Sequence, residues 1–388
     1  MRTCDVLIIG AGSVGVPLAL YCAERGLSTI VLEKNASWGR GQNRAAIGGL
    51  RATHSDPAKI RLCQESIRIV SGLEAERGID VEWRAGGYLF VAYDEQRERA
   101  FRDLLVTQKA AGLDIDWIGP ERVAELCPGI RRDGLLGGTF SPGDGYASPL
   151  MTNTAFHRLA RAAGAEFRFG EGVVSMATTP DRVSGARRIA SVRTDKDEYS
   201  AAVVVDAAGA DAADIAGLVD LEIPVHPDCH EAGVTEPCER FLEPMLVDIR
   251  PDDESGNYYF YQTVTGQIVF CITPKPQIWG KDTDSTSSFL PLVSRRMIEL
   301  YPRLRNLKVR RTWRGMYPMT PDGLPIVGYP RECPNLLLAV GMCGQGFMLG
   351  PGLGRLLADA IADGPEAAAD VFEELSLYRK FEGMELLK

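Results

Sequence analysis

The chain has 388 residues, which exceeds a typical single domain and predicts two structural units. Hydrophobic residues make up 45% of the chain and charged residues 24%, the balance of a globular protein with a large core. The net charge of −9 argues against nucleic acid or an anionic membrane surface as a partner.

The N-terminal segment has the pattern of a strand, a glycine turn, a helix and a second strand. Residues 4–9 are a short apolar run with β-branched side chains, typical of a buried parallel strand. Residues 10–15 follow as GxGxxG, a helix is predicted at 16–25, and a second strand at 28–32 leads to Glu33. This order is typical of a dinucleotide-binding βαβ unit. A structural βαβ unit without a ligand remains the alternative.

Each part of this unit has a physical task. Gly10 permits the tight turn, Gly12 lets the backbone approach a pyrophosphate, and Gly15 lets helix and strand pack together. The helix N-terminus offers N–H groups to the phosphates, and Glu33 is placed to accept hydrogen bonds from ribose hydroxyls. The candidate binding residues in this segment are Gly10, Gly12, Ser13, Val14, Gly15, Glu33 and Lys34.

The later elements are predicted from the spacing of apolar residues and from glycine and proline. Helices are expected at 56–77, 95–111, 120–126, 149–163, 292–301 and 351–362. Strands are expected at 81–83, 87–91, 165–176, 188–194, 199–205, 258–261, 268–272 and 336–340. A strand, a glycine loop and a helix recur near both ends, which indicates a cofactor domain assembled from separated segments with a second lobe between them.

The nine cysteines are scattered, and none forms a CxxC pair. With only four histidines as well, we expect no metal site. We also expect reduced thiols in a cytoplasmic protein, because no targeting signal is evident and no apolar run approaches the roughly 20 residues of a membrane span.

Four landmarks, in order along the chain, carry a family resemblance. They are the GxGxxG motif with Glu33, the sequence VDAAG at 205–209, PDGLPIVG at 321–328 and GMCGQGF at 341–347. In this order they resemble the FAD-dependent amino acid oxidase superfamily, nearest its sarcosine oxidase β-subunit and proline dehydrogenase β-subunit branches. The resemblance implies FAD as the cofactor and an α/β fold, with an FAD-binding Rossmann-like domain and a substrate domain that has a largely antiparallel sheet. The expected FAD-binding domain is 1–50, 148–218 and 322–388, and the expected substrate-binding domain is 51–147 and 219–321.

The resemblance also assigns candidate flavin contacts. The helix start after the last glycine loop would face the N1/C2=O edge of the flavin, where its positive dipole end suits a developing negative charge. An ordinary helix entry is the alternative. The loop at 40–49 would pass beside the flavin ring, and Val173 or Val174 would meet the adenine through its backbone. The implied cofactor residues are Asn43, Arg44, Ala45, Val174, Ala208, Gly209, Gly344, Gly346, Phe347 and Met348.

Three departures from the family pattern are informative. Gly315 stands where monomeric sarcosine oxidases carry the cysteine that binds the flavin covalently, so we expect non-covalent FAD. Met348 stands where they carry a lysine for the substrate carboxylate, and Phe270 aligns roughly with their oxygen-activating lysine. The loss of both cations favours a dehydrogenase over an oxidase.

The candidate catalytic residues are Arg51, His54, Tyr259 and Met348. The family places a carboxylate-binding arginine at Arg51, and a planar fork of donors suits a carboxylate. His54 would tune the amine or the flavin. Tyr259 faces one side of its strand and Tyr258 the other, so Tyr259 could line the pocket. Each assignment has an alternative. Arg51 could be a surface arginine in a loop, His54 could only satisfy local hydrogen bonds, and Tyr259 could belong to an aromatic core.

The expected reaction oxidises the C–N bond of a proline-, sarcosine- or opine-like amino or imino acid. A hydride passes to flavin N5, water hydrolyses the imine, and electrons reach a non-oxygen acceptor or a partner subunit. The alternatives are an amine oxidase that produces hydrogen peroxide, an FAD-bearing subunit that is inactive alone, and an NAD(P) dehydrogenase. Whether His230 belongs to an FMN site at a subunit interface is left open.

Overall fold

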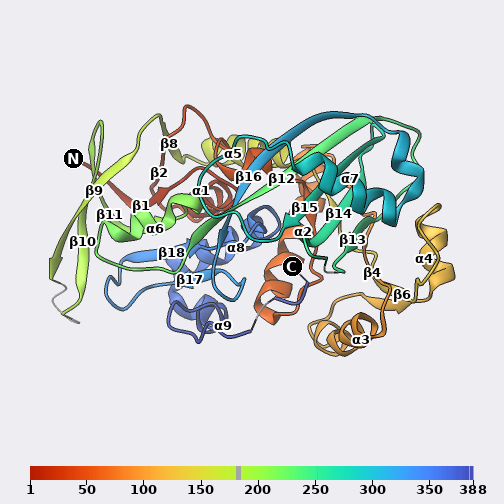
Figure 1. Ribbon diagram of the computed structural model, residues 1–388. Coiled ribbons are helices and arrows are strands. Elements are labelled where there is room, and N and C mark those ends of the chain that lie inside the picture. The colour runs from red at the N-terminus through yellow and green to blue at the C-terminus, as the bar shows by residue number, and fades with distance from the viewer. Residues whose placement is uncertain (181–184, 251, 384, 388) are drawn as a thin grey trace.

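The computed structural model describes residues 1–180, 185–250, 252–383 and 385–387. Two large sheets dominate it, and Figure 1 shows one toward the left and the other toward the right of the view. The first sheet draws its strands from residues 2–33, 166–206 and 326–340, and the second draws them from residues 88–141 and 226–319. The predicted α/β fold, with a Rossmann-like part and a largely antiparallel second sheet, is confirmed.

The first sheet has a parallel centre. Its main path runs β17 (Ile326–Gly328), β18 (Leu336–Val340), β11 (Glu198–Asp206), β1 (Arg2–Ile9), β2 (Thr29–Glu33) and β8 (Glu166–Phe169). A hairpin of β9 (Val173–Pro180) and β10 (Arg187–Thr194) continues from β11. β1 pairs in parallel with both β2 and β11, so the carboxyl ends of these strands meet at one edge.

Helices cover this sheet on one face and the β9–β10 hairpin lies toward the other. The helices are α1 (Gly15–Glu24), α2 (Pro57–Arg77), α5 (Pro149–Ala162) and α8 (Gly346–Asp363), and their apolar side chains form one core with β1 and β2. The opposite face packs on the short helix α6 (Ala212–Gly217). The βαβ unit is therefore buried on both faces, as its apolar strands predict.

The second sheet is antiparallel except where β13 meets β4. Its order is β16 (Val309–Met319), β12 (His226–Pro237), β15 (Gln267–Pro274), β14 (Ser255–Gln262), β13 (Met245–Asp248), β4 (Tyr88–Ala92), β6 (Gly137–Ser141) and β5 (Asp116–Ile118). One face packs on α4 (Pro120–Leu126) and α7 (Phe289–Leu300). The other packs toward α3 (Glu95–Ala110) and the small β3–β7 pair (Gly49–Leu50 and Gly145–Tyr146).

Most of the predicted elements are present, and two predictions are wrong. Residues 81–83 form no strand, and only Arg84 makes an isolated bridge to Tyr146. The last predicted helix was placed at 351–362, whereas α8 begins at Gly346. Pro351 and three nearby glycines resemble helix breakers, but they lie in the first turns of a helix that packs closely on its neighbours.

The glycines of α8 allow this close packing. A Cβ atom on Gly350 would overlap the Ser13 carbonyl oxygen, and one on Gly352 would overlap the Leu62 carbonyl oxygen. The Ser66 hydroxyl also accepts a hydrogen bond from the Gly352 N–H at 2.8 Å. The glycines therefore lower the helix propensity of α8 but allow its backbone to contact the GxGxxG loop and α2.

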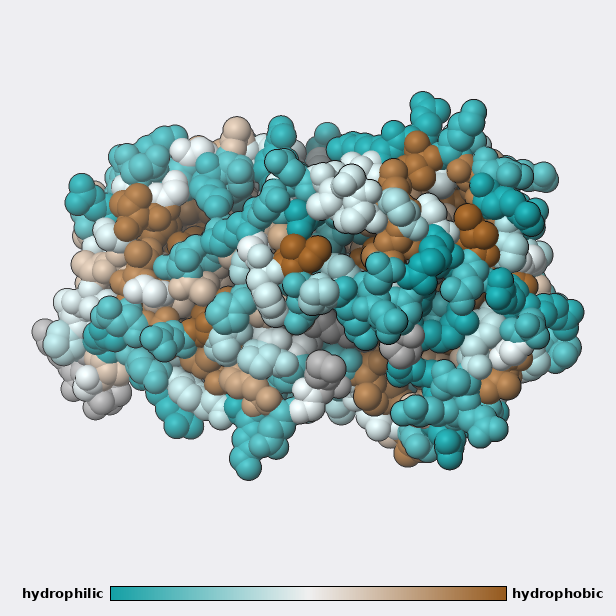
Figure 2. All heavy atoms as spheres, viewed as in Figure 1, coloured by the Kyte–Doolittle hydropathy of each residue, from teal (hydrophilic) through white to brown (hydrophobic). Residues whose placement is uncertain are grey.

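The surface is mainly polar. Figure 2 shows hydrophilic side chains over most of one face, with apolar side chains in separate patches. No helix in the described part of the chain is both long and apolar enough to span a membrane. Among the same residues, no group of three or more His, Cys, Asp and Glu side chains could hold a metal ion.

We predict that Gly352→Ala lowers the free energy of unfolding by about 1–3 kcal/mol, because the added methyl group must displace α2. Gly217→Ala is the matched control, since a Cβ there meets nothing within 4 Å and alanine favours the helix. Denaturant unfolding of the two variants and the parent protein measures the difference. Equal stability of both variants would contradict the packing argument.

Candidate active site

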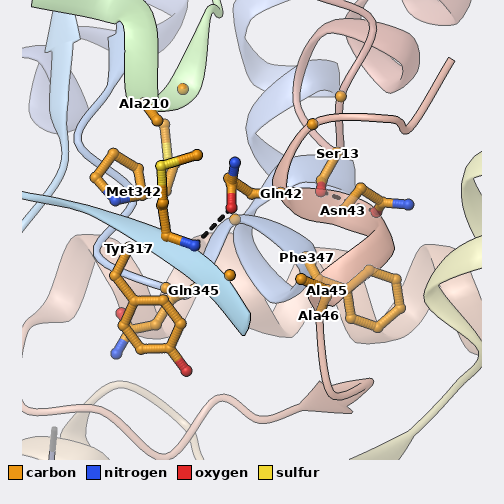
Figure 3. A pocket seen from close by; sticks show the side chains of 18 of the residues that line it. Ser13, Gln42, Asn43, Ala45, Ala46, Ala210, Tyr317, Met342, Gln345 and Phe347 are labelled. Carbon is orange, nitrogen blue, oxygen red and sulfur yellow. Dashed lines mark hydrogen bonds between the residues drawn. The ribbon is translucent and has the colours of Figure 1, made fainter. Parts of the chain in front are cut away.

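A cavity of about 460 Å³ is lined by residues of both sheets. From the first sheet come the loop after β1 and the end of β2, and from the second come residues of β12, β14, β15 and β16. The loop at 41–49 and the start of α8 also line it (Figure 3), as do residues of β4 and β13. The cavity therefore joins the dinucleotide-type loop to the antiparallel sheet.

The GxGxxG loop is shaped by contacts that exclude side chains. Gly10 has φ +110°, and a Cβ there would lie 2.5 Å from the Ala207 carbonyl oxygen. A Cβ on Gly15 would overlap the Gly10 carbonyl oxygen, so Gly15 closes the turn but lies outside the cavity lining. Gly12 faces open space, which leaves room for a bound group against the backbone.

Glu33, at the end of β2, is buried and braces this loop. Its carboxylate accepts hydrogen bonds from the Ala11 N–H at 3.0 Å and from the Asn35 N–H at 2.8 Å. Lys34 lines the cavity, and its Nζ forms an ion pair with the Asp211 Oδ2 at 2.5 Å. Ala208 and Gly209, which follow β11, line the same end.

The adenine contact assigned to Val174 is corrected by the structure. The Val174 side chain is 52% exposed and lies outside the cavity lining, whereas Val173 lines the cavity. Because the expected contact is through the backbone, the residue that reaches the cavity decides between the two valines, and that residue is Val173. Val173 therefore replaces Val174 as the candidate.

The loop at 41–49 is tied to both sheets. The Asn43 Oδ1 accepts a hydrogen bond from the Ser13 hydroxyl at 3.0 Å, and the Gln42 Oε1 accepts one from the Met316 N–H at 2.6 Å (Figure 3). Ala45 also lines the cavity. Arg44 is exposed and outside the lining, so its assignment as a cofactor contact is corrected.

The last glycine loop and the start of α8 form another part of the cavity wall. Gly344, Gly346, Phe347 and Met348 all line the cavity. Gly344 has φ +81°, and a Cβ there would overlap the ring of Tyr317, so this position requires glycine. The first-turn N–H groups of a helix lack intrahelical acceptors, and here they lie at the cavity.

These features fit a flavin dinucleotide. Two helix starts, of α1 and α8, meet one cavity, and Gly12 leaves open space beside the backbone. The Gln345 side chain is 6% exposed, and its Oε1 atom has no hydrogen-bond partner among the described residues although it lines the cavity. A buried acceptor without a partner is costly, so a donor from a bound group suits this position.

Arg51 also lines the cavity and is 6% exposed. Its Nη1 donates to the Thr53 carbonyl oxygen and lies 3.2 Å from the His54 Nδ1, and its Nη2 donates to the Leu387 carbonyl oxygen at 2.7 Å. Since a guanidinium has five N–H groups, Nε and one hydrogen of Nη2 remain beyond these contacts. Arg51 is thus a buried, held cation, which sets aside the alternative of a surface arginine.

His54 lies behind Arg51 and outside the cavity lining. Its Nε2 is 3.4 Å from the Cys63 sulfur, and it is fully buried. Burial, with the charges of Arg51 and Lys59 added, lowers the pKa of His54 well below its usual value. A neutral His54 therefore contacts Arg51, and the structure does not place it where it could touch an amine or a flavin directly.

An aromatic group forms the wall on the second sheet. The Tyr259 and Tyr317 hydroxyls are 3.1 Å apart, and the Tyr317 ring stacks on His230 with ring centres 3.8 Å apart. The His230 Nε2 lies 3.1 Å from the Asp228 Oδ2. Burial alone would raise the pKa of Asp228, but the hydrogen bonds from His230 and the Ile278 N–H together with the His230 charge lower it overall. Burial raises the pKa of both tyrosines well above the usual value, so both stay protonated.

Phe270 does not face this wall. Its side chain is fully buried in the core on the opposite face of β15, stacked on Phe289, while Cys271 lines the cavity. The alignment of Phe270 with an oxygen-activating lysine is therefore wrong, and it no longer bears on the electron acceptor.

Sequence reasoning missed several lining residues, namely Gln42, Tyr317, Gln345, Cys271 and Leu387. The sequence did point toward Tyr317, because it lies two residues after Gly315, which stands where monomeric sarcosine oxidases carry the flavin-linked cysteine. Gln42 and Gln345 lie inside the two loops already assigned to the flavin. No sequence pattern pointed to Leu387, because its contact with Arg51 joins residues 336 positions apart.

The fold and the cavity define a flavin-dinucleotide-binding oxidoreductase. In agreement, residues 5–360 match the family model described as FAD dependent oxidoreductase, so the chain belongs to this family. It is therefore an FAD-dependent oxidoreductase, and the NAD(P) alternative falls away.

Several known proteins are similar along most of the chain. Mitochondrial sarcosine dehydrogenase of Mus musculus is 26% identical over 93% of this chain and 40% of its own length, and mitochondrial dimethylglycine dehydrogenase of Rattus norvegicus is 27% identical over 95% and 44%. The chain thus spans less than half of these two relatives. Glycine oxidase of Bacillus subtilis is 26% identical over 93% of both chains. The crystal structure of L-proline dehydrogenase from P. horikoshii has a TM-score of 0.85 and 29% identity over 93% of this chain and 94% of that one.

We predict that Glu33→Gln raises the dissociation constant for FAD about tenfold, because an amide replaces a charged acceptor that braces the loop and faces the cavity. Titration of the apoprotein with FAD, followed by flavin fluorescence, measures this constant. Glu222→Gln, at an exposed position, is the control. An unchanged constant for Glu33→Gln would remove Glu33 from the binding site.

Asp206 generates a prediction about pH. It is fully buried at the end of β11, its Oδ1 accepts a hydrogen bond from the Ala208 N–H at 3.0 Å, and burial raises its pKa to about 7. A raised carboxyl pKa means that the folded state holds a proton that the unfolded state has released. Stability from this group is therefore present below the unfolded pKa of about 4 and is lost as the pH rises toward 7.

We predict that Asp206→Asn, which mimics the protonated acid, gains stability relative to the parent protein between pH 5 and pH 8. The expected gain exceeds about 1.4 kcal/mol, the equivalent of one pKa unit. Denaturant unfolding at both pH values measures it, with the exposed Asp133→Asn as control. A stability difference that is the same at both pH values would show that Asp206 does not titrate in this range.

Proposed function

We propose that this protein oxidises the C–N bond of an amino or imino acid of the proline, sarcosine or opine type, and passes the electrons to an acceptor other than oxygen. One observation carries the proposal: the cavity lined by the dinucleotide-type loop is also lined by a buried arginine, Arg51. A buried cation with free donors suits the carboxylate of a small substrate. The printed names of relatives as sarcosine, dimethylglycine and L-proline dehydrogenases support the same substrate class.

The side chains around Arg51 have distinct tasks in this proposal. The Nε and second Nη2 hydrogens of Arg51 bind the carboxylate and so orient the substrate. Tyr88, Phe90 and Val247 line the cavity beside it and exclude water, which favours the unprotonated amine. When bound, FAD supplies the hydride acceptor for the carbon beside the nitrogen.

The protonated phenols of Tyr259 and Tyr317 offer hydrogen bonds at the same wall of the cavity. A phenolate near the substrate would stabilise the protonated amine, whereas a neutral phenol does not. Met348 adds apolar surface to this end of the cavity and brings no second cation. We infer that the substrate carboxylate relies on Arg51 more than on any other charge.

We further propose that FAD is held without a covalent bond. Gly315 lines the cavity and offers no sulfur, and burial raises the pKa of the nearby Cys271 thiol to about 11, which keeps it protonated. The nine cysteines are free thiols, which supports a cytoplasmic location. The strand content of the two sheets supports an FAD-binding domain at 1–50, 148–218 and 322–388, with 51–147 and 219–321 binding the substrate.

The proposal is tested by mixing the purified protein with amines under nitrogen and following flavin absorbance. L-proline, D-proline, sarcosine and an opine form the first panel, and we expect at least one to bleach the flavin. A panel that leaves the flavin oxidised would favour the alternative of an FAD-bearing subunit that needs a partner. Peroxide formed at the rate of dye reduction would favour the alternative of an oxidase, as the name of glycine oxidase among the relatives allows.

We predict that Arg51→Met raises KM at least tenfold for a carboxylated substrate, because the charge that holds the carboxylate is lost. Arg40→Met, at an exposed position in the same region, is the control and should keep KM within about twofold of the parent value. Steady-state dye reduction measures both. An unchanged KM for Arg51→Met would remove Arg51 from the substrate site.

A further inference from the structure

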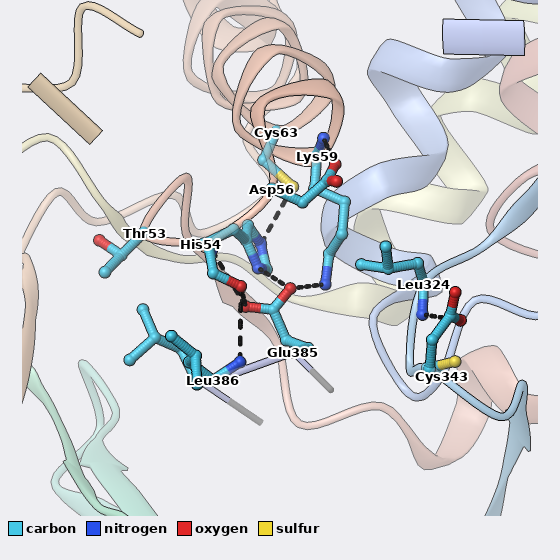
Figure 4. A network of polar contacts seen from close by, with 12 residues as sticks. Thr53, His54, Asp56, Lys59, Cys63, Leu324, Cys343, Glu385 and Leu386 are labelled. Atoms are coloured by element: carbon cyan, nitrogen blue, oxygen red, sulfur yellow. Dashed lines mark hydrogen bonds and ion pairs between the residues drawn. The ribbon is translucent and has the colours of Figure 1, made fainter. Parts of the chain in front are cut away.

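Residues 385–387 fold back against the first turn of α2 through a buried ion pair. The Glu385 carboxylate lies 2.6 Å from the Lys59 Nζ and also accepts hydrogen bonds from the Ser55 N–H at 3.0 Å and the Ser55 hydroxyl at 2.7 Å (Figure 4). The Lys59 side chain is fully buried and Glu385 is 6% exposed. Separating a buried ion pair leaves uncompensated charges and is strongly destabilising, so this contact fixes the position of the segment.

The two residues that follow point in opposite directions. Leu386 is 58% exposed, whereas Leu387 is 3% exposed and packs with Tyr88, Phe90 and Val247. Leu387 also lines the cavity, at the end where Arg51 lies. The segment therefore supplies one apolar side chain to the cavity wall although it is remote in sequence from the rest of that wall.

The backbone of the same residue holds the arginine. The Leu387 carbonyl oxygen accepts the Arg51 Nη2 hydrogen at 2.7 Å, while Nη1 is held by the Thr53 carbonyl oxygen. Two acceptors on different terminal nitrogens fix the plane of the guanidinium and leave its remaining donors pointing in set directions. A side chain fixed in this way loses little entropy when it binds a carboxylate.

We propose that residues 385–387 are a built-in clamp on the substrate end of the cavity. Glu385 anchors the segment, the Leu387 carbonyl orients Arg51, and the Leu387 side chain limits the size of the group accepted beside the carboxylate. Glu385 and Lys59 are thus positioning residues, and Leu387 determines specificity. The inference rests on the proposed role of Arg51, and its test uses ligand binding without turnover so that the two can fail separately.

The size limit is tested with Leu387→Ala and the exposed control Leu386→Ala. Acetate, 2-methylpropanoate and benzoate are titrated into the FAD-loaded protein, and binding is followed by the change in flavin absorbance. We expect the ratio of dissociation constants for benzoate over acetate to fall about tenfold in Leu387→Ala and to stay unchanged in Leu386→Ala. An unchanged ratio in Leu387→Ala, with the flavin content retained, would overturn the specificity role.

The positioning role is tested with Glu385→Gln and the exposed control Glu382→Gln. We expect the acetate dissociation constant and the substrate KM to rise about tenfold in Glu385→Gln while kcat stays within about twofold. A purely structural role would instead lower kcat, flavin content and the unfolding midpoint together, and that pattern would overturn the proposal. If Glu385→Gln does not fold, adding Lys59→Met removes the stranded charge, and the same loss of acetate affinity is expected.

The outcomes separate the clamp from the proposed reaction. Arg51-dependent acetate binding that weakens in Glu385→Gln supports the clamp even if no amine bleaches the flavin, in which case only the proposed reaction fails. Bleaching by an amine together with clamp variants that behave like the parent protein overturns the clamp and leaves the reaction standing.

Discussion

The whole arrangement depends on the close approach of α8 to the loop after β1. A side chain at Gly350 would overlap the Ser13 carbonyl oxygen, and one at Gly15 would overlap the Gly10 carbonyl oxygen. Because no side chain separates these backbones, two helix starts lie at one cavity although they are more than 300 positions apart in sequence. That convergence of helix N-termini is what suits the site to a large anionic cofactor.

The second sheet supplies the other part of the cavity wall. β16 and β12 bring Tyr317 and His230 to the cavity, and the Met316 N–H bond to Gln42 ties this sheet to the loop at 41–49. Around Arg51, Glu385 pairs with Lys59, while the contacts of Arg51 itself are to neutral groups such as the Leu387 carbonyl oxygen. Asp144 holds the backbone of Ala52 beside it. The proposed cofactor and substrate sites thus share one cavity, which direct transfer between them requires.

Local patterns predicted what is decided locally. The GxGxxG turn, Glu33 and the helix at 57–77 were found because turn chemistry and apolar spacing are short-range properties. The start of α8 was misplaced because glycines that serve tertiary packing resemble helix breakers. Phe270 was misassigned because an alignment shifted by one residue along a strand places the side chain on the opposite face of the sheet. The 385–387 segment could not be predicted at all, since Glu385 and Lys59 meet across 326 positions through burial and charge alone.

Acid precipitation of the purified protein tests most directly the proposal that this cavity holds FAD without a covalent bond. The account predicts that FAD, equimolar with the chain, is released into the supernatant and that the pellet retains no flavin fluorescence. A colourless protein that takes up no added FAD, or flavin that stays in the pellet, would contradict it.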